Sequence, residues 1–373
     1  VYAMESADLC AVYCNPIQVP VADPVIYYEA GTYYLYGTWD VDSLTGIAVH
    51  TSRDLVHWQW QGFAFRKTET THGQRNFWGA EVIKHGEEYL LYYCASPNRE
   101  DTLPLNMAIY VAKGKSPLGP FKEWKAPLYA ANESDEAIDQ NFFLDEDGTP
   151  WLYFVRVTRM HNEIWVAKLS QDLGAFEGEP TLCIRSEAGA WDSRPWEGHR
   201  VAEGPLVFKR NGVYCLEYTG NHFLDPDYAI GFATADTPRG PWKRYDGNPV
   251  LSRSDKVFGP GNACIVPSPD GTEEFIVYHI HQSPRTPQPR YLAIDRIRIK
   301  AEPGGKMSFS VEGPTHTPQV LPAGAAARPY AVSDDFTGAS LVRKQWSVLH
   351  EDPDNWYYEK GDLVIQTQAG DCW

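Results

Sequence analysis

The chain has 373 residues and a formal net charge of −16, with 49 Asp and Glu against 33 Lys and Arg. Such an acidic protein is a poor partner for nucleic acid, because binding a polyanion requires a basic face that displaces counterions. No apolar run is long enough to cross a bilayer, so we expect no membrane partner. The 13 Trp and 22 Tyr suit the packing of strands and also the packing of sugar rings.

Residues 1–8 contain neither the basic nor the apolar region of a signal peptide. The native location is therefore left open, with the cytoplasm as the default. The seven cysteines are an odd number without zinc-site or CxxC spacing, and Cys10 with Cys14 is the one pair that could bridge. The cysteines that we expect to be free and buried in apolar strands are Cys94, Cys215 and Cys264.

A hairpin pattern recurs five times along the chain. In its third copy Asp139 precedes an apolar strand, residues 145–148 form an acidic turn that ends in Gly, and the aromatic strand 150–154 returns. The marker residues that begin the five copies are Asp23, Glu81, Asp139, Glu203 and Asn262. Their successive positions differ by 58, 58, 64 and 59 residues, which indicates an internal repeat.

A second turn follows each of the first four markers. These turns lie at residues 52–55, 116–120, 170–174 and 237–241, and the fifth copy lacks a clear equivalent. Repeats made of short strands without helical periodicity predict an all-β fold, the five-bladed β-propeller. If each marker holds the same place in its blade, all five surround the central axis. Four are carboxylates, which repel and desolvate one another there, so we predict an active site.

The domain organisation follows from composition. We assign residues 1–321 to the catalytic propeller, 322–333 to a linker of Ala, Gly and Pro, and 334–373 to a partial C-terminal β segment. About forty residues are too few for an independent β-sandwich. Residues 188–199 are too polar and aromatic for a strand, so we expect a long loop in front of Glu203.

The motifs around the markers resemble glycoside hydrolase family 43, the five-bladed propeller α-L-arabinofuranosidases, β-xylosidases and arabinanases. The resemblance covers roughly residues 15–320, and the tail from Asp335 resembles the start of the β-sandwich that follows some of these propellers. The residues that carry it are 21–24, 78–81, 137–139, 142–143, 147–148, 202–205, 259–261 and Arg290.

The resemblance implies three catalytic carboxyls. Asp23 matches the general base, Glu203 the general acid, and Asp139 the carboxylate that orients the acid and tunes its pKa. Inversion at a glycosidic bond needs one protonated carboxyl beside the leaving oxygen and one ionised carboxylate that holds water, ~6.5–9.5 Å away. We expect repulsion from Asp139 to raise the pKa of Glu203, which keeps Glu203 protonated near neutral pH.

The resemblance also implies substrate contacts. Arg290 would organise the carboxylates and contact the sugar, or else form a salt bridge on the blade surface. Trp78 and Trp39 match aromatic walls of the sugar pocket, although Trp39 could equally be a packing residue between blades. Glu81 would contact a sugar hydroxyl or accept backbone hydrogen bonds.

No cofactor is required for this chemistry, but the resemblance implies a structural calcium ion on the propeller axis. Family members hold it with a His and waters, and Asn262 stands here where His is common. His279, or Asn262 through its carbonyl oxygen, remains a candidate ligand, and a sodium ion, a water or nothing at all are the alternatives.

We therefore predict an inverting, exo-acting glycosidase that releases α-L-arabinofuranosyl or β-D-xylosyl units from plant-type glycans. The alternatives are a carbohydrate-binding propeller without catalysis and a family-43-like galactosidase or galactofuranosidase. Buried acids that repel one another give a lectin no advantage, which disfavours the first alternative. The expected partner is a carbohydrate, and the oligomeric state is left open.

Overall fold

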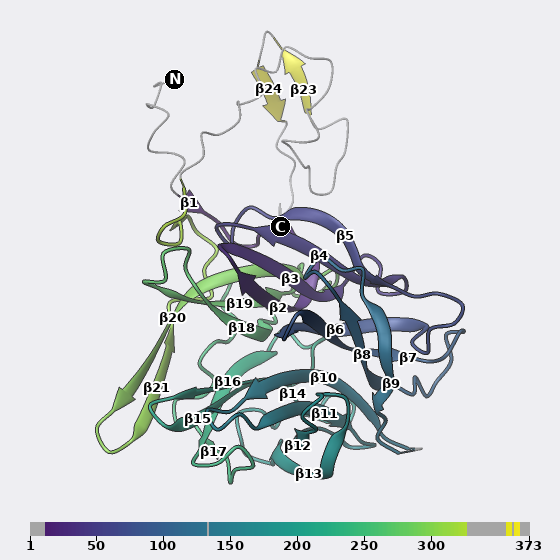
Figure 1. Ribbon diagram of the computed structural model, residues 1–373. Helices are drawn as coiled ribbons and strands as arrows, with labels where there is room; N and C mark the ends of the chain where they lie inside the picture. The colour runs from purple at the N-terminus through teal and green to yellow at the C-terminus, as the bar shows by residue number, and fades with distance from the viewer. Residues whose placement is uncertain (1–11, 133, 327–355, 360–361, 366–373) are drawn as a thin grey trace. The chain divides into compact units, whose positions relative to one another are not determined.

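The computed structural model describes residues 12–132, 134–326, 356–359 and 362–365. All regular elements in these ranges are strands, and none of these residues belongs to a helix that could cross a membrane. The chain divides into a unit of Val12–Ala325 and a second unit that combines Val1–Ala11 with Ala326–Trp373. The first unit is a five-bladed β-propeller, as predicted (Figure 1).

Each blade is an antiparallel sheet whose strands follow one another in chain order. Blade 1 contains β2 (Val21–Glu29), β3 (Thr32–Trp39), β4 (Gly46–Ser52) and β5 (Gln59–Arg66). Blade 2 contains β6 (Arg75–His85), β7 (Glu88–Ser96), β8 (Ala108–Gly114) and β9 (Lys122–Tyr129). Blade 3 contains β10 (Glu136–Leu144), β11 (Pro150–Val157), β12 (His161–Leu169) and β13 (Phe176–Arg185). Blade 4 contains β14 (Arg200–Arg210), β15 (Val213–Gly220), β16 (Ala229–Ala235) and β17 (Lys243–Arg244). Blade 5 contains β18 (Gly261–Pro267), β19 (Glu274–Ile280), β20 (Tyr291–Glu302) and β21 (Lys306–Val311).

The first strands of the blades form the inner ring. Contacts run from β2 to β6, β10, β14 and β18 in turn and back to β2, and Figure 1 shows these five strands around one centre. Side chains alternate between the two faces of each sheet, and here both faces are apolar. Each face packs on one of the two neighbouring blades. Five buried apolar clusters result, one between each pair of adjacent blades.

The chain near the N-terminus closes the ring against blade 5. Strand β1 (Val12–Tyr13) pairs with β22 (Gln319–Val320), and the side chain of Asn15 makes two hydrogen bonds to the backbone of Ile294. In the second unit, β23 (Trp356–Glu359) pairs antiparallel with β24 (Asp362–Ile365). The rest of the predicted C-terminal β segment lies outside the described residues.

Every first strand carries a β-bulge, where two residues face one on the neighbouring strand. The residues that precede the bulges are Ala22, Trp78, Ile138, Glu203 and Gly261. The residues that follow have positive φ angles: 50° at Asp23, 40° at Gly79, 51° at Asp139, 60° at Gly204 and 42° at Asn262. Asp, Asn and Gly adopt this left-handed conformation at the lowest cost, which explains the residue types found there.

These bulges correct the predicted alignment of the markers. Asp23, Asp139 and Asn262 do hold the same place in their blades, but Glu203 lies one residue before that place and Glu81 two residues after it. A side chain points in a different direction after a one-residue shift. The assumption that all five markers are equivalent is therefore wrong for Glu81 and Glu203.

Tyrosines on the second strands connect each of the first three blades to a turn of the next blade. Tyr92 donates to the carbonyl of Leu173 at 3.0 Å and Tyr153 to that of Pro238 at 2.6 Å, and Tyr36 donates in the same way to Pro117. These acceptors lie in the turns that the sequence shows after the markers. The equivalent residue of blade 4 is Glu217, whose two buried oxygens have no hydrogen-bond partner among the described residues. Blade 5 also lacks the turn.

A second set of inter-blade bonds involves the N–H groups of the bulges. The acceptors lie opposite the bulges on the second strands: Thr38 for Gly79 (3.3 Å), Thr219 for Asn262 (2.9 Å) and His279 for Asp23 (3.1 Å). Blade 3 has Val155 at this place, which has no acceptor. The N–H of Gly204 instead donates to the carboxylate of Asp139 at 3.3 Å.

Cys94, Cys215 and Cys264 are free and buried, as predicted. The suggested bridge between Cys10 and Cys14 involves a residue outside the described ranges. Residues 188–199 contain no strand between β13 and β14, which confirms the predicted loop.

Candidate active site

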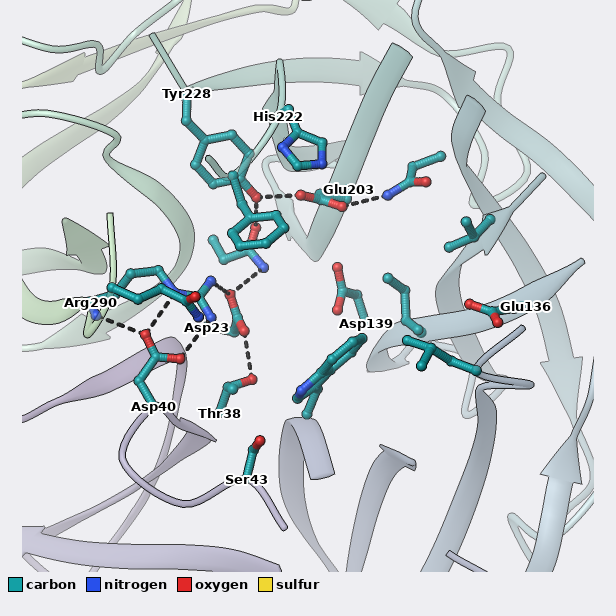
Figure 2. Close-up of a pocket in the computed structure, with 18 of the residues that line it drawn as sticks. Asp23, Thr38, Asp40, Ser43, Glu136, Asp139, Glu203, His222, Tyr228 and Arg290 are labelled. Atoms are coloured by element: carbon teal, nitrogen blue, oxygen red, sulfur yellow. Dashed lines mark hydrogen bonds and ion pairs between the residues drawn. The ribbon is translucent and has the colours of Figure 1, made fainter. Parts of the chain in front are cut away.

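The three predicted catalytic carboxyls lie on one cavity of about 460 Å³. Asp23 comes from blade 1, Asp139 from blade 3 and Glu203 from blade 4, and Figure 2 shows all three facing the same space. The left-handed conformation at Asp23 and Asp139 aims their side chains out of the regular alternation of the strand. Residues 64 to 180 positions apart in sequence thus meet because the blades repeat around one centre.

Asp23 is surrounded by donors. Thr38 donates to its Oδ2 at 2.6 Å, the amide of Asn262 donates to its Oδ1 at 2.8 Å, and a guanidinium nitrogen of Arg290 lies 3.3 Å from the same oxygen. All three partners donate, and an ionised carboxylate, which only accepts, satisfies them. Asp23 is therefore held as a carboxylate whose oxygens face the cavity.

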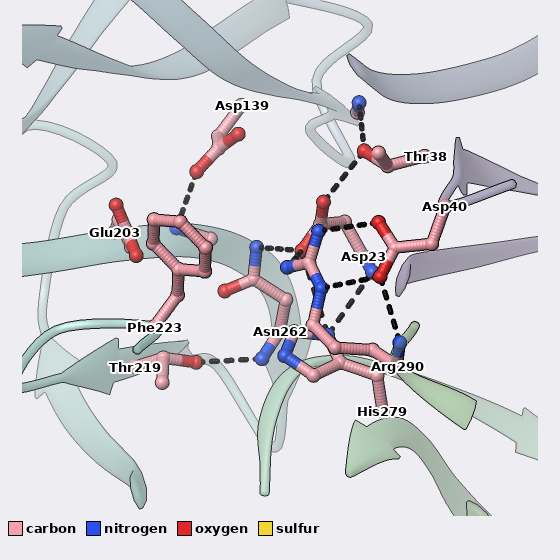
Figure 3. Close-up of polar contacts among 12 residues, drawn as sticks. Asp23, Thr38, Asp40, Asp139, Glu203, Thr219, Phe223, Asn262, His279 and Arg290 are labelled. Atoms are coloured by element: carbon pink, nitrogen blue, oxygen red, sulfur yellow. Dashed lines mark hydrogen bonds and ion pairs between the residues drawn. The ribbon is translucent and has the colours of Figure 1, made fainter. Parts of the chain in front are cut away.

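Arg290 is held by a second acid, Asp40. Its Nε and Nη2 donate to the two carboxylate oxygens, each at 3.0 Å, and its backbone N–H donates to Oδ2 at 2.7 Å (Figure 3). The guanidinium also lies 5.3 Å from the ring centre of Phe223. Arg290 is buried in the cavity wall, so the alternative of a salt bridge on the blade surface does not hold.

Glu203 and Asp139 have a different environment, because neither forms an ion pair with a described residue. Burial raises the pKa of Glu203 to about 7, against the opposing effect of hydrogen bonds from Tyr228 and Asn162. Burial, then the charges of Glu203 and Asp23, raise the pKa of Asp139 well above its usual range. The elevated pKa of Glu203 agrees with the prediction, but its main cause is desolvation rather than repulsion by Asp139.

Two polar side chains position the carboxyl of Glu203. The amide nitrogen of Asn162 lies 2.6 Å from Oε2, and the hydroxyl of Tyr228 lies 2.7 Å from Oε1. Asn162 is itself oriented by His199, whose Nε2 lies 2.8 Å from the amide oxygen. His199 belongs to the predicted loop, so this loop supports the acid side of the cavity.

The same loop is anchored at the rim of the cavity. Arg194 forms an ion pair with Asp225 at 3.1 Å. Trp196 stacks on His222 with ring centres 5.2 Å apart, and His222 lines the cavity. The loop and the segment before β16 therefore form one wall.

The predicted substrate contacts divide into two groups. Trp78 and Arg290 line the cavity, whereas Trp39 and Glu81 are not among the lining residues. Trp39 packs on His50 and Trp60 at 5.0 and 4.9 Å between ring centres, which supports its alternative role in packing.

Glu81 lies toward blade 3. It accepts a hydrogen bond from the backbone N–H of Phe142 at 2.6 Å, and burial raises its pKa to about 8. Of its two interpretations, the structure supports the backbone acceptor. Asn141, at the equivalent place in blade 3, accepts from the N–H of Val207 in the same way at 2.8 Å.

The residues named for a calcium ion do not fit one. Both polar atoms of the Asn262 side chain are engaged, by Asp23 and by Tyr228. Nδ1 of His279 accepts the N–H of Asp23, so the neutral ring carries its hydrogen on the buried Nε2 and offers a cation no lone pair. The described residues contain no group of three or more His, Cys, Asp or Glu side chains that could hold a metal ion.

Several cavity residues were not predicted from the sequence. They are Thr38, Asp40, Asn162, His199, His222, Phe223 and Tyr228. Asp40 follows Trp39 directly, so its position at the end of β3 was the one local signal. Of the others, Thr38 lies on a second strand, Asn162 on the third strand β12 and the rest on loops, where the repeat provides no marker.

A closed propeller whose cavity holds a carboxylate paired with an arginine on one wall and a buried carboxyl with a raised pKa on another defines the protein as a glycoside hydrolase. The comparison with protein families agrees. The sequence model of glycosyl hydrolases family 43 matches residues 13–303, and the chain belongs to this family.

Individual relatives are more distant. The chain is 27% identical to a beta-D-galactofuranosidase of Aspergillus niger, over 69% of this chain and 73% of that protein. It is also 27% identical to an extracellular exo-alpha-(1->5)-L-arabinofuranosidase of Streptomyces chartreusis, over 73% and 83%. Among solved structures, a thermostable family-43 glycoside hydrolase has 36% identity and a TM-score of 0.75, covering 84% of this chain and 100% of that one.

Proposed function

We propose that the protein is an inverting, exo-acting glycosidase that releases single pentosyl units, α-L-arabinofuranosyl or β-D-xylosyl. Asp23 is the general base, Glu203 the general acid, and Asp139 the residue that orients the acid. The observation that carries this proposal is the contrast between Asp23, which pairs with Arg290, and Glu203, which is buried without a cation, on two walls of one cavity.

The reaction requires an ionised Asp23 and a protonated Glu203. Asp23 accepts a proton from a water molecule that attacks the anomeric carbon, while Glu203 protonates the glycosidic oxygen as the bond to that carbon breaks. Asn262 and the hydroxyl of Tyr228 lie between the two carboxyls, so the acid and the base do not touch. This separation leaves room for a sugar and a water, as inversion requires.

Two observations support exo action on a small sugar. The cavity is a pocket of about 460 Å³ with the loop 188–199 on one wall, which suits one sugar ring better than a long chain. Relatives named as arabinofuranosidase, xylosidase and arabinosidase favour a pentose. The galactofuranosidase relative makes galactofuranose the first hexose to compare.

A panel of nitrophenyl glycosides tests the proposal. We expect hydrolysis of the α-L-arabinofuranoside or the β-D-xyloside, with a lower kcat/KM on the β-D-galactofuranoside. Proton NMR of the first product should show the anomer opposite to that of the substrate. Retention of configuration, or activity on none of the panel, would refute it.

A further inference from the structure

Tyr228 bridges the two catalytic carboxyls. Its hydroxyl lies 2.7 Å from Oε1 of Glu203 and 2.8 Å from Oδ1 of Asn262, and the amide nitrogen of Asn262 lies 2.8 Å from Asp23. The orientation of the amide is fixed, because the ionised Asp23 accepts only from the nitrogen. The oxygen of Asn262 therefore faces Tyr228.

A hydroxyl has one hydrogen, and Tyr228 has two acceptors. When Glu203 is protonated, its own hydrogen can fill the contact to Tyr228, whose hydrogen then points to Asn262. When Glu203 is ionised, the hydrogen of Tyr228 is needed at Oε1. Rotation of the Tyr228 O–H group therefore satisfies the hydrogen bonds of both the protonated and the ionised Glu203.

Close packing keeps the bridge in this position. A Cβ atom added at Gly204 would lie 2.3 Å from Oδ1 of Asn262, so only Gly leaves room for this amide. The ring of Tyr228 stacks on His279 with centres 5.8 Å apart, and Tyr228 is fully buried.

We propose that Tyr228 is a positioning residue that turns its hydroxyl hydrogen from Asn262 to Glu203 as Glu203 protonates the leaving group. This inference rests on the proposed function. The proton moves from Glu203 to the glycosidic oxygen, the bond from that oxygen to the anomeric carbon breaks with its electron pair on the oxygen, and the O–H bond of Tyr228 stays intact.

This rotation favours the transition state over the ground state. A hydrogen bond to a carboxylate is stronger than one to a neutral amide, so the bond gained exceeds the bond lost only after proton transfer has begun. The stabilisation of the transition state by Tyr228 must therefore depend on how much protonation the leaving group needs.

The test compares Tyr228→Phe with the wild-type enzyme on two aryl glycosides of the same sugar. Phenyl glycoside requires protonation and dinitrophenyl glycoside does not. We expect kcat on the phenyl glycoside to fall roughly 10- to 100-fold, with KM unchanged and little change on the dinitrophenyl glycoside. Equal losses on both substrates, or no loss on either, would overturn the proposal.

Tyr153→Phe is the matched control. It removes another tyrosine hydroxyl, one that donates to the carbonyl of Pro238 outside the cavity. We expect this variant to cleave both glycosides at the wild-type ratio.

A measurement without substrate separates this proposal from the proposed function. In protein labelled with ¹³C at the Glu carboxyls, the signal lost in Glu203→Gln identifies Glu203. That signal should shift in Tyr228→Phe and stay in place in Tyr153→Phe, even if the enzyme hydrolyses none of the panel. An unchanged signal in Tyr228→Phe refutes the bridge.

Discussion

On the blade 1 side of the cavity, Asp23 accepts from Thr38, Asn262 and Arg290, with Asp40 behind the arginine. On the blade 3 and 4 side, Asp139 and Glu203 are buried without an ion pair among the described residues. The same type of group is paired with a cation on one wall and is buried with a raised pKa on the other. Partners, rather than residue type, decide which acid is the base.

The junctions between blades repeat this contrast. Between blades 5 and 1, His279 accepts the N–H of Asp23, so the backbone needs nothing from the carboxylate. Between blades 3 and 4, Val155 cannot accept, and the N–H of Gly204 turns to Asp139. Because Val155 offers no acceptor, the N–H of Gly204 binds Asp139 and becomes part of the acid side of the cavity.

The largest effect should come from removing either carboxyl. Asp23→Asn and Glu203→Gln should each lower kcat on phenyl glycosides about 10²- to 10⁴-fold. On dinitrophenyl glycosides Glu203→Gln should recover and Asp23→Asn should not, because only the acid becomes dispensable. Glu81→Gln, which alters a carboxyl outside the cavity, is the control. Similar recovery in both variants would contradict the assigned roles.

The next effect concerns stability. Arg290→Gln leaves Asp40 and Asp23 without their cation, and we expect the free energy of unfolding in urea to fall by about 3–5 kcal/mol. Arg298→Gln breaks an exposed pair with Glu312 and should cost at most about 1 kcal/mol. Equal losses would mean that the base side does not depend on Arg290.

The pH dependence tests the acid side. Because burial raises the pKa of Glu203 to about 7, the active protonated form persists up to that pH. Above it, kcat/KM should fall about tenfold per pH unit, since only the protonated fraction can act. This fall of kcat/KM at high pH should be absent when Glu203→Gln cleaves the dinitrophenyl glycoside. A fall of kcat/KM that begins near pH 4 to 5 would show that Glu203 has the pKa of an ordinary glutamate.

The smallest effect concerns the junction between blades 3 and 4. Val155→Thr restores the acceptor that Thr38 and Thr219 provide elsewhere, and it should draw the N–H of Gly204 away from Asp139. We expect kcat/KM to fall roughly 2- to 10-fold, the effect of one neutral hydrogen bond. Val155→Ala disturbs the packing more than the nearly isosteric Val155→Thr but gains no acceptor, so it should keep more activity than Val155→Thr. Equal losses in both would assign the effect to packing.

The sequence was sufficient to predict the blades and the convergence of Asp23, Asp139 and Glu203. Each blade repeats the same hairpin, and the left-handed residue of its bulge has to be Asp, Asn or Gly, so the pattern is visible along the chain. The exact register was not visible, because a bulge shifts side chains by one or two residues without changing composition. Glu81 was placed in the pocket for this reason.

The partners of the acids could not be predicted. Asp40 meets Arg290 across 250 residues, and Tyr228 comes from a segment without repeat signal. Trp39 was predicted as a wall of the sugar pocket but packs on Trp60. An aromatic residue beside a cavity and one in a packing cluster have the same sequence pattern.

The replacement of the connecting tyrosine by Glu217, together with the turn that blade 5 lacks, leaves the seam between blades 4 and 5 without the cross-link that the first three blades make. A chain cut on the segment after β17 would separate the first four blades from the fifth at this seam. Two separately expressed pieces should then reassemble into a working enzyme more readily than pieces divided at a seam that has the tyrosine cross-link, which makes this seam the place to build a split reporter.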